Sequence, residues 1–267
     1  MALISIDRKK CKKDGICAAE CPFSLIALTG DEGFPEIRPA AARLCIQCGH
    51  CVAVCPHDAL SLAAMNPDDF QAIGNGALLP TLKKTGQLLT TRRSIRTYQR
   101  QTVPRAHIEQ LLDLCRWAPS AKNEQPVHWL VVENPEAVHH LAGLVVDWLR
   151  TGTAYPGIVS AWDQGKDMVL RGAPHLLVAH AHGDSLKPEI DCTIALTYFD
   201  LAAASCGIGT CWAGILMSAA AAGHQPLLDA LALPEGYHLY GAMIFGYPRF
   251  PYFKIPPRKD TRVIWRS

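Results

Sequence analysis

Cys45-Ile-Gln-Cys48-Gly49-His-Cys51-Val-Ala-Val-Cys55-Pro56 is the stretch that decides the first part of the fold. A near copy, Cys11-Lys-Lys-Asp14-Gly15-Ile-Cys17-Ala-Ala-Glu-Cys21-Pro22, stands 34 residues earlier in the chain. The copy matches the later stretch at every cysteine except one, where Asp14 takes the place of Cys48. Thiols at this spacing, each set closed by a Cys-Pro pair, indicate two related metal-binding loops.

The later stretch has the spacing C-x2-C-x2-C-x3-C-P, which resembles that of bacterial ferredoxins and indicates iron–sulfur clusters. Three thiolates on a tight loop hold three corners of a cubane, and the cysteine before the proline binds the other cluster. Disulfides do not suit a chain expected in the cytoplasm, and zinc sites rarely use four cysteines at such a crowded spacing. The predicted ligand sets are therefore crossed: Cys45, Cys48, Cys51 and Cys21 for one cluster, and Cys11, Cys17 and Cys55 for the other.

Asp14 leaves three alternatives open for the second cluster. Its carboxylate can replace a thiolate at one iron of a 4Fe–4S cluster, as a harder and more labile ligand. A 3Fe–4S cluster, which lacks the fourth iron, is the second alternative. The third is a surface aspartate beside Gly15, where both residue types suit a turn.

The composition is that of a globular enzyme without a strong charge bias. The chain has 267 residues and a mass of 29.1 kDa, with 49% hydrophobic residues, 19% charged residues and a formal net charge of +2. This balance gives no electrostatic reason to expect nucleic acid or an anionic membrane as a partner. No signal peptide is evident at the N-terminus, and the uncharged run from Leu201 to Gly223 is broken by glycines. We expect a cytoplasmic protein without a membrane span.

Three segments follow one another along the chain. We expect a ferredoxin-like domain at residues 1–64, a Gly, Asn and Pro-rich linker at residues 65–90, and a larger domain at residues 91–267. In the larger domain, helices are predicted from Pro104 to before Pro119, at 135–150 and at 190–205. Strands are predicted at 128–133, 175–182 and 237–245. Alternating helices and a few strands favour an α+β fold in layers.

Four further motifs stand in order in the larger domain. They are Arg92-Arg93-Ser94-Ile95-Arg96, Ala118-Pro-Ser120-Ala-Lys-Asn123-Glu-Gln125-Pro126, Gly207-Ile-Gly209-Thr-Cys211-Trp-Ala213-Gly214, and Phe245-Gly-Tyr-Pro248 followed by Pro256-Pro-Arg258-Lys259. Their order and spacing over residues 91–259 resemble the nitroreductase family of FMN-dependent oxidoreductases. The whole chain is similar to the ferredoxin-fused branch of that family. The resemblance implies a two-cluster ferredoxin-like domain fused to a three-layer α+β nitroreductase-like FMN domain.

The resemblance assigns FMN-binding roles that agree with the chemistry of the residues. Guanidinium, hydroxyl and ammonium groups suit a flavin phosphate, and Arg92, Arg93, Ser94, Arg258 and Lys259 supply them. Arg96 is expected at the pyrimidine edge of the ring, where a cation stabilises reduced flavin. By the resemblance, Ser120, Asn123 and Gln125 reach the FMN of the partner subunit. It also implies that the backbone N–H groups of Ala213 and Gly214 face flavin N5 and O4.

The resemblance also implies a function. Electrons from reduced ferredoxin pass through two iron–sulfur clusters to FMN, which reduces a small substrate such as a nitroaromatic, quinone or enone. The expected assembly is a homodimer, and the uncharged run from Leu201 to Gly223 is taken as an apolar interface. Two other functions remain open: a non-catalytic electron-transfer or sensor module, and a dehalogenating flavoenzyme with a lid from residues 151–170. The histidines are expected to pack in the core or on the surface, and Cys115, Cys192, Cys206 and Cys211 are expected to be small buried residues.

Overall fold

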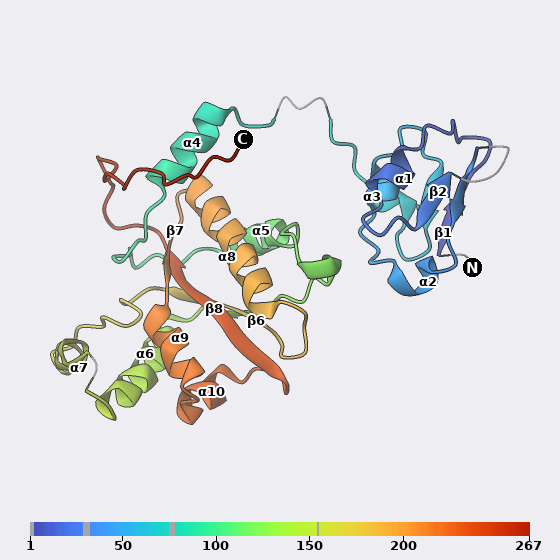
Figure 1. The fold of residues 1–267 in the computed structure, drawn as a ribbon. Helices are drawn as coiled ribbons and strands as arrows, with labels where there is room; N and C mark the ends of the chain where they lie inside the picture. Colours follow the sequence, from blue (N-terminus) through green and yellow to red (C-terminus); the bar gives the residue numbers. More distant parts are fainter. Residues whose placement is uncertain (1–2, 29–32, 75–77, 154) are drawn as a thin grey trace. The chain divides into compact units, whose positions relative to one another are not determined.

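The computed structural model describes residues 3–28, 33–74, 78–153 and 155–267. The chain divides into two compact units, residues 1–79 and residues 80–267 (Figure 1). The boundary lies inside the predicted linker. The last nine residues of that predicted linker, 82–90, lie in a helix, α4 (Leu82–Thr91). Its first turn is capped by the Thr81 side chain, which accepts the Lys84 N–H. The connector is therefore shorter than the composition of residues 65–90 suggested.

The N-terminal unit is built from very short elements. Strand β1 (Ile4–Ile6) pairs with β4 (Leu60–Leu62), and β2 (Ile26–Leu28) pairs with β3 (Pro35–Ile37), both antiparallel. Each small sheet therefore joins one strand from each half of the repeat. Helices α1 (Ile16–Glu20), α2 (Ala41–Leu44) and α3 (His50–Ala53) complete the unit, and a 3-10 turn, η1 (Pro67–Asp69), follows. Its core is a small cluster around Ile4, Ile26 and Leu60 that also includes Cys17.

The C-terminal unit is organised around one four-stranded antiparallel sheet. Its strands are β5 (His128–Val132), β6 (His175–His182), β7 (Gly209–Trp212) and β8 (Tyr237–Gly246), in the order β5-β6-β8-β7. Around the sheet lie α5 (Arg105–Cys115), the 3-10 turn η2 (Ala121–Asn123), α6 (Pro135–Arg150), α7 (Pro156–Asp163), α8 (Pro188–Ser205), α9 (Gly214–Ala221) and α10 (Gln225–Leu231).

Helices cover both faces of this sheet. Leu176 and Val178 of β6 pack in one hydrophobic core with α6, α9 and α10, whereas Leu177 and Ala179 pack in a second core with α5 and α8. Successive residues of a strand point to opposite faces, so a strand covered on both sides is apolar without alternation. Figure 1 shows α8 on one face, with α9 and α10 on the other. The predicted three-layer α+β architecture is confirmed.

The predicted elements of the larger unit agree closely with the observed ones, but α4, α7, α9, α10 and β7 were not predicted. The helices at 105–115, 135–150 and 188–205 and the strands at 128–132, 175–182 and 237–246 lie where they are expected. The strand that was not predicted, β7, is short and contains glycine, threonine and cysteine instead of an alternating pattern. His175 is a core residue as expected: it stacks on Phe245, and burial lowers its pKa.

The uncharged run from Leu201 to Gly223 carries two predictions: that it does not span a membrane and that it forms an apolar interface. Among the described residues, no helix combines the length and the apolar character that crossing a bilayer requires. The apolar interface stays a prediction: Cys211, Leu216 and Ala219 are buried inside their own unit, whereas Trp212 in the same run is 40% exposed. Cys206 also differs from expectation: it is exposed at the end of α8, whereas Cys115, Cys192 and Cys211 are buried.

Candidate functional site

The first group of predicted cluster ligands is gathered around Cys17. Burial raises the pKa of the Cys17 thiol, and negative charge on Cys55, Asp14 and Cys11 raises it further, which means that these groups lie close together. Cys55 belongs to the second half of the repeat and the other three to the first half. The crossed set predicted from the spacing is therefore brought together by the fold.

The second group lies around Cys51. Burial raises the pKa of this thiol to about 11, and Cys48, Cys45 and Cys21 act in the same direction. All four cysteines line one small cavity, together with apolar side chains such as Phe23 and Leu25. Here the first half of the repeat supplies one cysteine, Cys21, to a loop of the second half. Four soft thiolates in an apolar surrounding form a donor set that suits an iron–sulfur cluster.

Backbone geometry repeats along with the cysteines. The Cys21 sulfur accepts the Leu25 N–H at 3.3 Å, and the Cys55 sulfur accepts the Ala59 N–H at 3.5 Å. Such N–H···S contacts are among the features that tune the potential of a cluster. Left-handed residues recur at the same offset of 34 positions: Lys13 and Gln47, Gly15 and Gly49, Ser24 and Asp58. The two halves are therefore two copies of one loop conformation.

Asp14 occupies the position that corresponds to Cys48. One of its carboxylate oxygens accepts the Ile16 N–H at 3.2 Å, and the other lies 3.7 Å from His57 Nε2. The carboxylate is thus held beside Cys17 while part of it remains exposed. Among the described residues, no three His, Cys, Asp or Glu side chains converge tightly enough to hold one metal ion. The ligands of a cubane bind different irons and stand further apart than the ligands of a single ion.

In the larger unit, the segment from Arg92 to Tyr98 runs beside β7, the edge strand of the sheet. Ser94 forms a parallel bridge with Thr210, and the Ile95 N–H donates to the Thr210 carbonyl at 2.8 Å. Gly209 allows this approach, because a Cβ there would stand 2.3 Å from Ile95 Cγ1. Gly246, which pairs with Gly209, leaves room for Pro174, whose Cγ would stand 2.5 Å from an added Cβ, and for Tyr98, whose ring would stand 3.2 Å from it. Two glycines of the sequence motifs therefore position the arginine segment.

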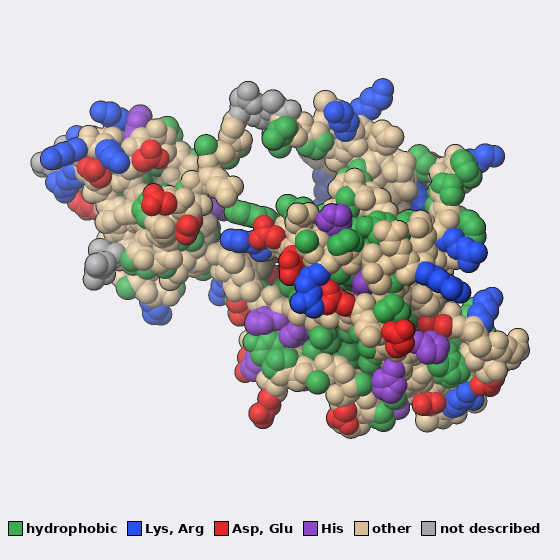
Figure 2. Space-filling view, turned by 180° about the vertical axis from the view of Figure 1, so that it is seen from behind, with side chains coloured by type: hydrophobic (Ala, Val, Ile, Leu, Met, Phe, Trp, Pro, Cys, Tyr) green, Lys and Arg blue, Asp and Glu red, His purple; other side chains and the backbone are tan. Residues whose placement is uncertain are grey.

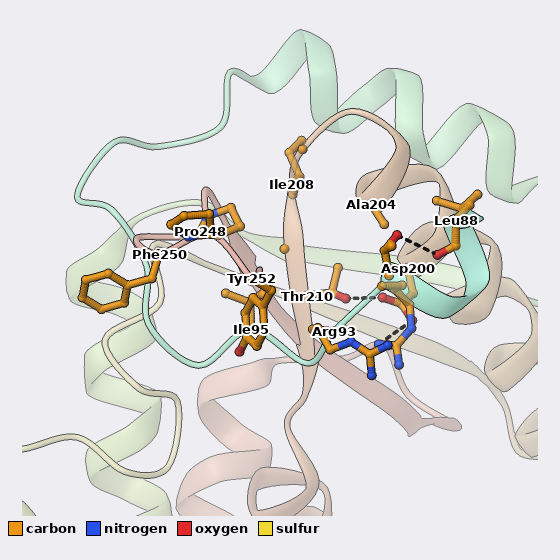
Figure 3. Close-up of a pocket in the computed structure, with 15 residues that line it drawn as sticks. Leu88, Arg93, Ile95, Asp200, Ala204, Ile208, Thr210, Pro248, Phe250 and Tyr252 are labelled. Atoms are coloured by element: carbon orange, nitrogen blue, oxygen red, sulfur yellow. Dashed lines mark hydrogen bonds and ion pairs between the residues drawn. The ribbon is translucent and has the colours of Figure 1, made fainter. Parts of the chain in front are cut away.

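A pocket opens beside this segment, and Arg92 lies in it with a carboxylate partner. Arg92 Nη1 lies 3.4 Å from Asp200 Oδ2, and the Thr210 hydroxyl donates to the other Asp200 oxygen. Figure 3 shows Asp200, Thr210 and Arg93 on one side of the pocket, with Phe250 and Tyr252 on the opposite side. Two arginines against one carboxylate leave an excess of positive charge, which suits a phosphate. Arg96 is exposed and does not line this pocket.

Ala213 and Gly214, whose backbone N–H groups are predicted to face the flavin, differ in whether those N–H groups already have a hydrogen-bond partner. The Ala213 N–H donates to the Ala242 carbonyl of β8 at 2.9 Å and is therefore used in the fold. Gly214 is the first residue of α9, where the first-turn N–H groups have no partner within the helix. A Cβ at Gly214 would meet no atom within 4 Å, so this backbone faces open space. Of the pair, Gly214 keeps the properties that a ring-facing donor requires.

The loop that carries Ser120, Asn123 and Gln125 is tightly held and lies in a different pocket. The Ser120 hydroxyl accepts the Gln125 N–H at 2.9 Å, and the Gln125 side chain donates to Asn123 Oδ1 at 3.1 Å. Both Asn123 and Gln125 have a left-handed backbone, which non-glycine residues adopt only when their surroundings impose it. Ser120 and Gln125 line a cavity with Asp191, and neither lines the Arg92 pocket. Within one chain the two groups are not brought together.

Arg258 and Lys259 lie in the exposed C-terminal segment, residues 249–267, which contains no helix or strand. They do not line the pocket of Arg92 either. The residue that the sequence reasoning missed is Asp200. One signal was available: Asp200 is the only charged residue between Cys192 and Leu228. A lone acid in a buried helix needs a partner.

Fold and sites together define an oxidoreductase that combines an iron–sulfur unit with a three-layer unit. Residues 89–247, more than half of the chain, match the Nitroreductase family, so the protein belongs to the nitroreductase family. Residues 9–60 match the 4Fe-4S dicluster domain. The predicted resemblances to a two-cluster ferredoxin domain and to the nitroreductase family are both confirmed.

Relatives and a solved structure resemble mainly the larger unit. Two relatives are provisionally named NADH dehydrogenase/NAD(P)H nitroreductase. The one from Methanothermobacter thermautotrophicus is 30% identical over 61% of this chain and 76% of its own length. The one from Archaeoglobus fulgidus is 28% identical over 61% of this chain and 84% of its own length. A nitroreductase of Bacteroides fragilis with bound FMN superposes with a TM-score of 0.60 at 22% identity. That match covers 68% of this chain and 99% of the other, and it concerns the fold.

Proposed function

We propose that this protein is an FMN-dependent reductase that receives electrons through two iron–sulfur clusters from a reduced ferredoxin. Its proposed substrates are small organic molecules such as nitroaromatics, quinones or enones. The observation that carries the proposal is the union, in one chain, of two crossed sets of cluster ligands with a phosphate-suited pocket in a nitroreductase unit. Clusters transfer single electrons, whereas bound FMN collects two and delivers them to a substrate stacked on its ring.

The proposed cluster ligands are the two groups around Cys17 and Cys51. Cys45, Cys48, Cys51 and Cys21 would hold a 4Fe–4S cluster, and the other set contains Cys11, Cys17, Cys55 and Asp14. Support for Asp14 as a ligand comes from its position beside Cys17, at the place that Cys48 takes in the other loop. A 3Fe–4S cluster at this site is the alternative. Iron and sulfide analysis of anaerobically purified protein tests the count, and close to four irons per chain would contradict two clusters.

In the proposed flavin site, Arg92, Arg93 and Ser94 hold the phosphate, and Asp200 positions Arg92. An arginine already oriented by a carboxylate loses less conformational freedom when a phosphate binds. The N–H groups at the start of α9, beginning with Gly214, supply donors at the ring, and Arg96 supplies the cation at the pyrimidine edge. Positive charge at that edge favours the anionic form of the reduced ring.

A homodimer completes this site in the proposal. Arg258 and Lys259 on one side, and the rigid Ser120–Gln125 loop on the other, lie outside the Arg92 pocket of their own chain. The C-terminal segment also exposes large apolar side chains, including Phe253, Ile264 and Trp265, each 87% or more exposed. Apolar side chains gathered on one exposed segment indicate a surface that another chain covers. Sedimentation analysis tests this assembly, and a monomer with stoichiometric FMN would contradict it.

The names of the relatives contain NAD(P)H, so a nicotinamide donor is the alternative to ferredoxin. The fused iron–sulfur unit favours a one-electron donor. Anaerobic stopped-flow reduction separates the two, with NADH, NADPH and dithionite-reduced ferredoxin offered in turn. We expect flavin bleaching and nitroaromatic turnover with ferredoxin. Rapid bleaching by NAD(P)H in a protein stripped of iron would contradict the proposed route.

The phosphate assignment has its own test. Replacing both Arg92 and Arg258 by alanine should weaken FMN binding about a hundredfold or more, because two charge-assisted hydrogen bonds are lost. Arg105→Ala is the matched control, since Arg105 pairs with Glu133 on the surface of the same unit. Fluorescence titration of the apoprotein with FMN measures both variants. An unchanged affinity in the double variant would remove these arginines from the site.

A further inference from the structure

The basic residues of the small unit are gathered at one of its two cluster sites. Residues 8–13, here called the basic segment, contain five Lys and Arg side chains around Cys11: Arg8, Lys9, Lys10, Lys12 and Lys13. The only other Lys or Arg residues in positions 1–79 are Arg38 and Arg43. Nine Asp and Glu residues are spread from Asp7 to Asp69, so the unit carries a formal charge of 7 − 9 = −2. The positive charge is therefore a local feature on a slightly acidic unit.

The basic segment has a defined conformation at the end of β1. Asp7 Oδ1 accepts the Lys9 N–H at 2.8 Å, and the Asp7 carbonyl accepts the Cys11 N–H at 3.0 Å. The Lys13 ammonium lies 4.2 Å from the centroid of the Phe34 ring, and the Arg8 guanidinium carbon lies 5.1 Å from the same centroid. A cation above an aromatic face is attracted by the ring and held in place. The segment therefore forms a fixed turn.

This turn surrounds a cluster ligand with exposed cations. The five basic residues are exposed, and Cys11 in their midst is half-buried. Figure 2 shows Lys and Arg side chains gathered on one part of the surface of the small unit. At the other site, the cavity that holds Cys45, Cys48 and Cys51 is lined by apolar residues such as Phe23 and Leu25. The two sites thus differ in the charge of the surface beside them.

We propose that the basic segment is the docking surface for a negatively charged electron-donor protein, and that electrons enter the chain at the Cys11 site. This inference rests on the proposed function. In each encounter the donor would be oxidised by one electron, and the cluster that Cys11, Cys17 and Cys55 would hold would be reduced by the same electron, with no bond formed or broken. Opposite charges accelerate the encounter of two proteins, and electron-transfer encounters use small interfaces, which a single turn with five cations can supply.

Two charge-reversal variants of the holoenzyme test the docking surface. Lys9→Glu with Lys12→Glu changes the basic segment, and Arg38→Glu with Arg43→Glu makes the same change in net charge elsewhere on the small unit. The probe is an acidic bacterial two-cluster ferredoxin, reduced and freed of excess dithionite, mixed with each protein in an anaerobic stopped-flow instrument. We expect the rate constant at low salt to fall about tenfold or more in the first variant and to stay within about twofold in the second.

Salt dependence and cross-linking provide readouts that do not depend on turnover or on variants. The wild-type rate constant should fall steadily as salt is added, because ions screen the attraction. Carbodiimide treatment of wild-type protein with the same ferredoxin should join carboxylates of the donor to lysines at positions 9, 10, 12 and 13, as read by peptide mass spectrometry. A wild-type rate that does not respond to salt, or cross-links concentrated at other lysines, would overturn the docking surface.

Failure of the docking surface can be told apart from failure of the proposed function. Reduced methyl viologen, a small cation, should reduce the clusters of the basic-segment variant at least as fast as those of the wild type. If viologen-reduced wild-type protein passes no electrons to flavin or nitroaromatic, the proposed function is wrong, whatever the cross-links show. If that transfer is normal but both charge-reversal variants slow equally with ferredoxin, the docking surface and the entry site are wrong.

Discussion

The two units of this protein reach a stable fold by different physical means. The larger unit has strands of up to ten residues and a hydrophobic core on each face of its sheet. The small unit has four strands of three residues each and one small core in which Cys17 is a member. Domains of this size rarely reach stability by burial alone, and a bound metal centre is a common addition. The comparison indicates that the large unit folds by itself, whereas the small unit depends on its clusters.

Removing the iron should have the largest effect and should separate the units. We expect anaerobic chelation to unfold residues 1–64 while the melting temperature of the larger unit stays nearly unchanged, because ligand binding is part of the folding free energy of the small unit. Hydrogen exchange measured peptide by peptide, before and after chelation, follows each unit. Cys51→Ser should give the same loss, and Cys206→Ser, at an exposed cysteine outside the clusters, is its control. Continued protection of β1 and β4 from hydrogen exchange without iron would show that the small unit folds without its clusters.

The larger unit is stabilised by close packing, whereas the small unit depends on metal ligands. Gly209→Ala should displace Ile95 and with it the arginine segment, because the added Cβ would overlap two atoms of Ile95. We expect FMN affinity to fall about tenfold or more, equivalent to roughly 1.4 kcal/mol, while the cluster absorbance stays normal. Gly86→Ala in α4, where a Cβ meets no atom within 4 Å, is the matched control. Equal FMN affinity in both variants would show that the packing of Gly209 does not position the site.

Within the small unit, the two proposed clusters should differ in their resistance to oxygen. Asp14→Cys should make the cluster at the Cys11 site more resistant to oxygen, because a thiolate binds iron more tightly than a carboxylate in a soft donor set. Anaerobic protein exposed to air, followed by electron paramagnetic resonance and absorbance, gives the decay of each cluster. The cluster of Cys45, Cys48 and Cys51 in the same molecule is the internal control. Equal decay rates that the substitution leaves unchanged would contradict the expectation.

The smallest expected effect concerns acid stability of the larger unit. Burial lowers the pKa values of His175 and His180 in the folded protein. In the unfolded chain both pKa values return to about 6.5. Between the lowered values and about 6.5, the unfolded chain therefore binds more protons than the folded one. Stability of this unit should therefore fall as the pH is lowered from 7 to 5. Denaturant titrations across this range measure the slope, and His175→Gln should reduce it. A slope unaffected by the substitution would assign the acid sensitivity to other groups.

Much of this molecule could be predicted from local sequence, and the rest depends on distant contacts. The crossed cysteine sets follow from the repeated spacing, and the starts of α6 and α8 are marked by Pro135 and Pro188. Strand β7 could not be predicted, because its four residues owe their conformation to pairing with β8. The Arg92–Asp200 pair joins residues far apart in the chain, and no local pattern connects them.

The exchange of Cys21 and Cys55 between the halves of the small unit has a consequence for how the protein is assembled. Each half of the repeat lends one thiol to the pocket of the other, so neither pocket is complete until both halves have been synthesised and brought together. If both pockets hold clusters as proposed, loading of the first cluster would bring the opposite Cys-Pro segment close to its own pocket and so prepare the second site. Filling of the two pockets should be cooperative, and a chain truncated after the first half should retain neither cluster.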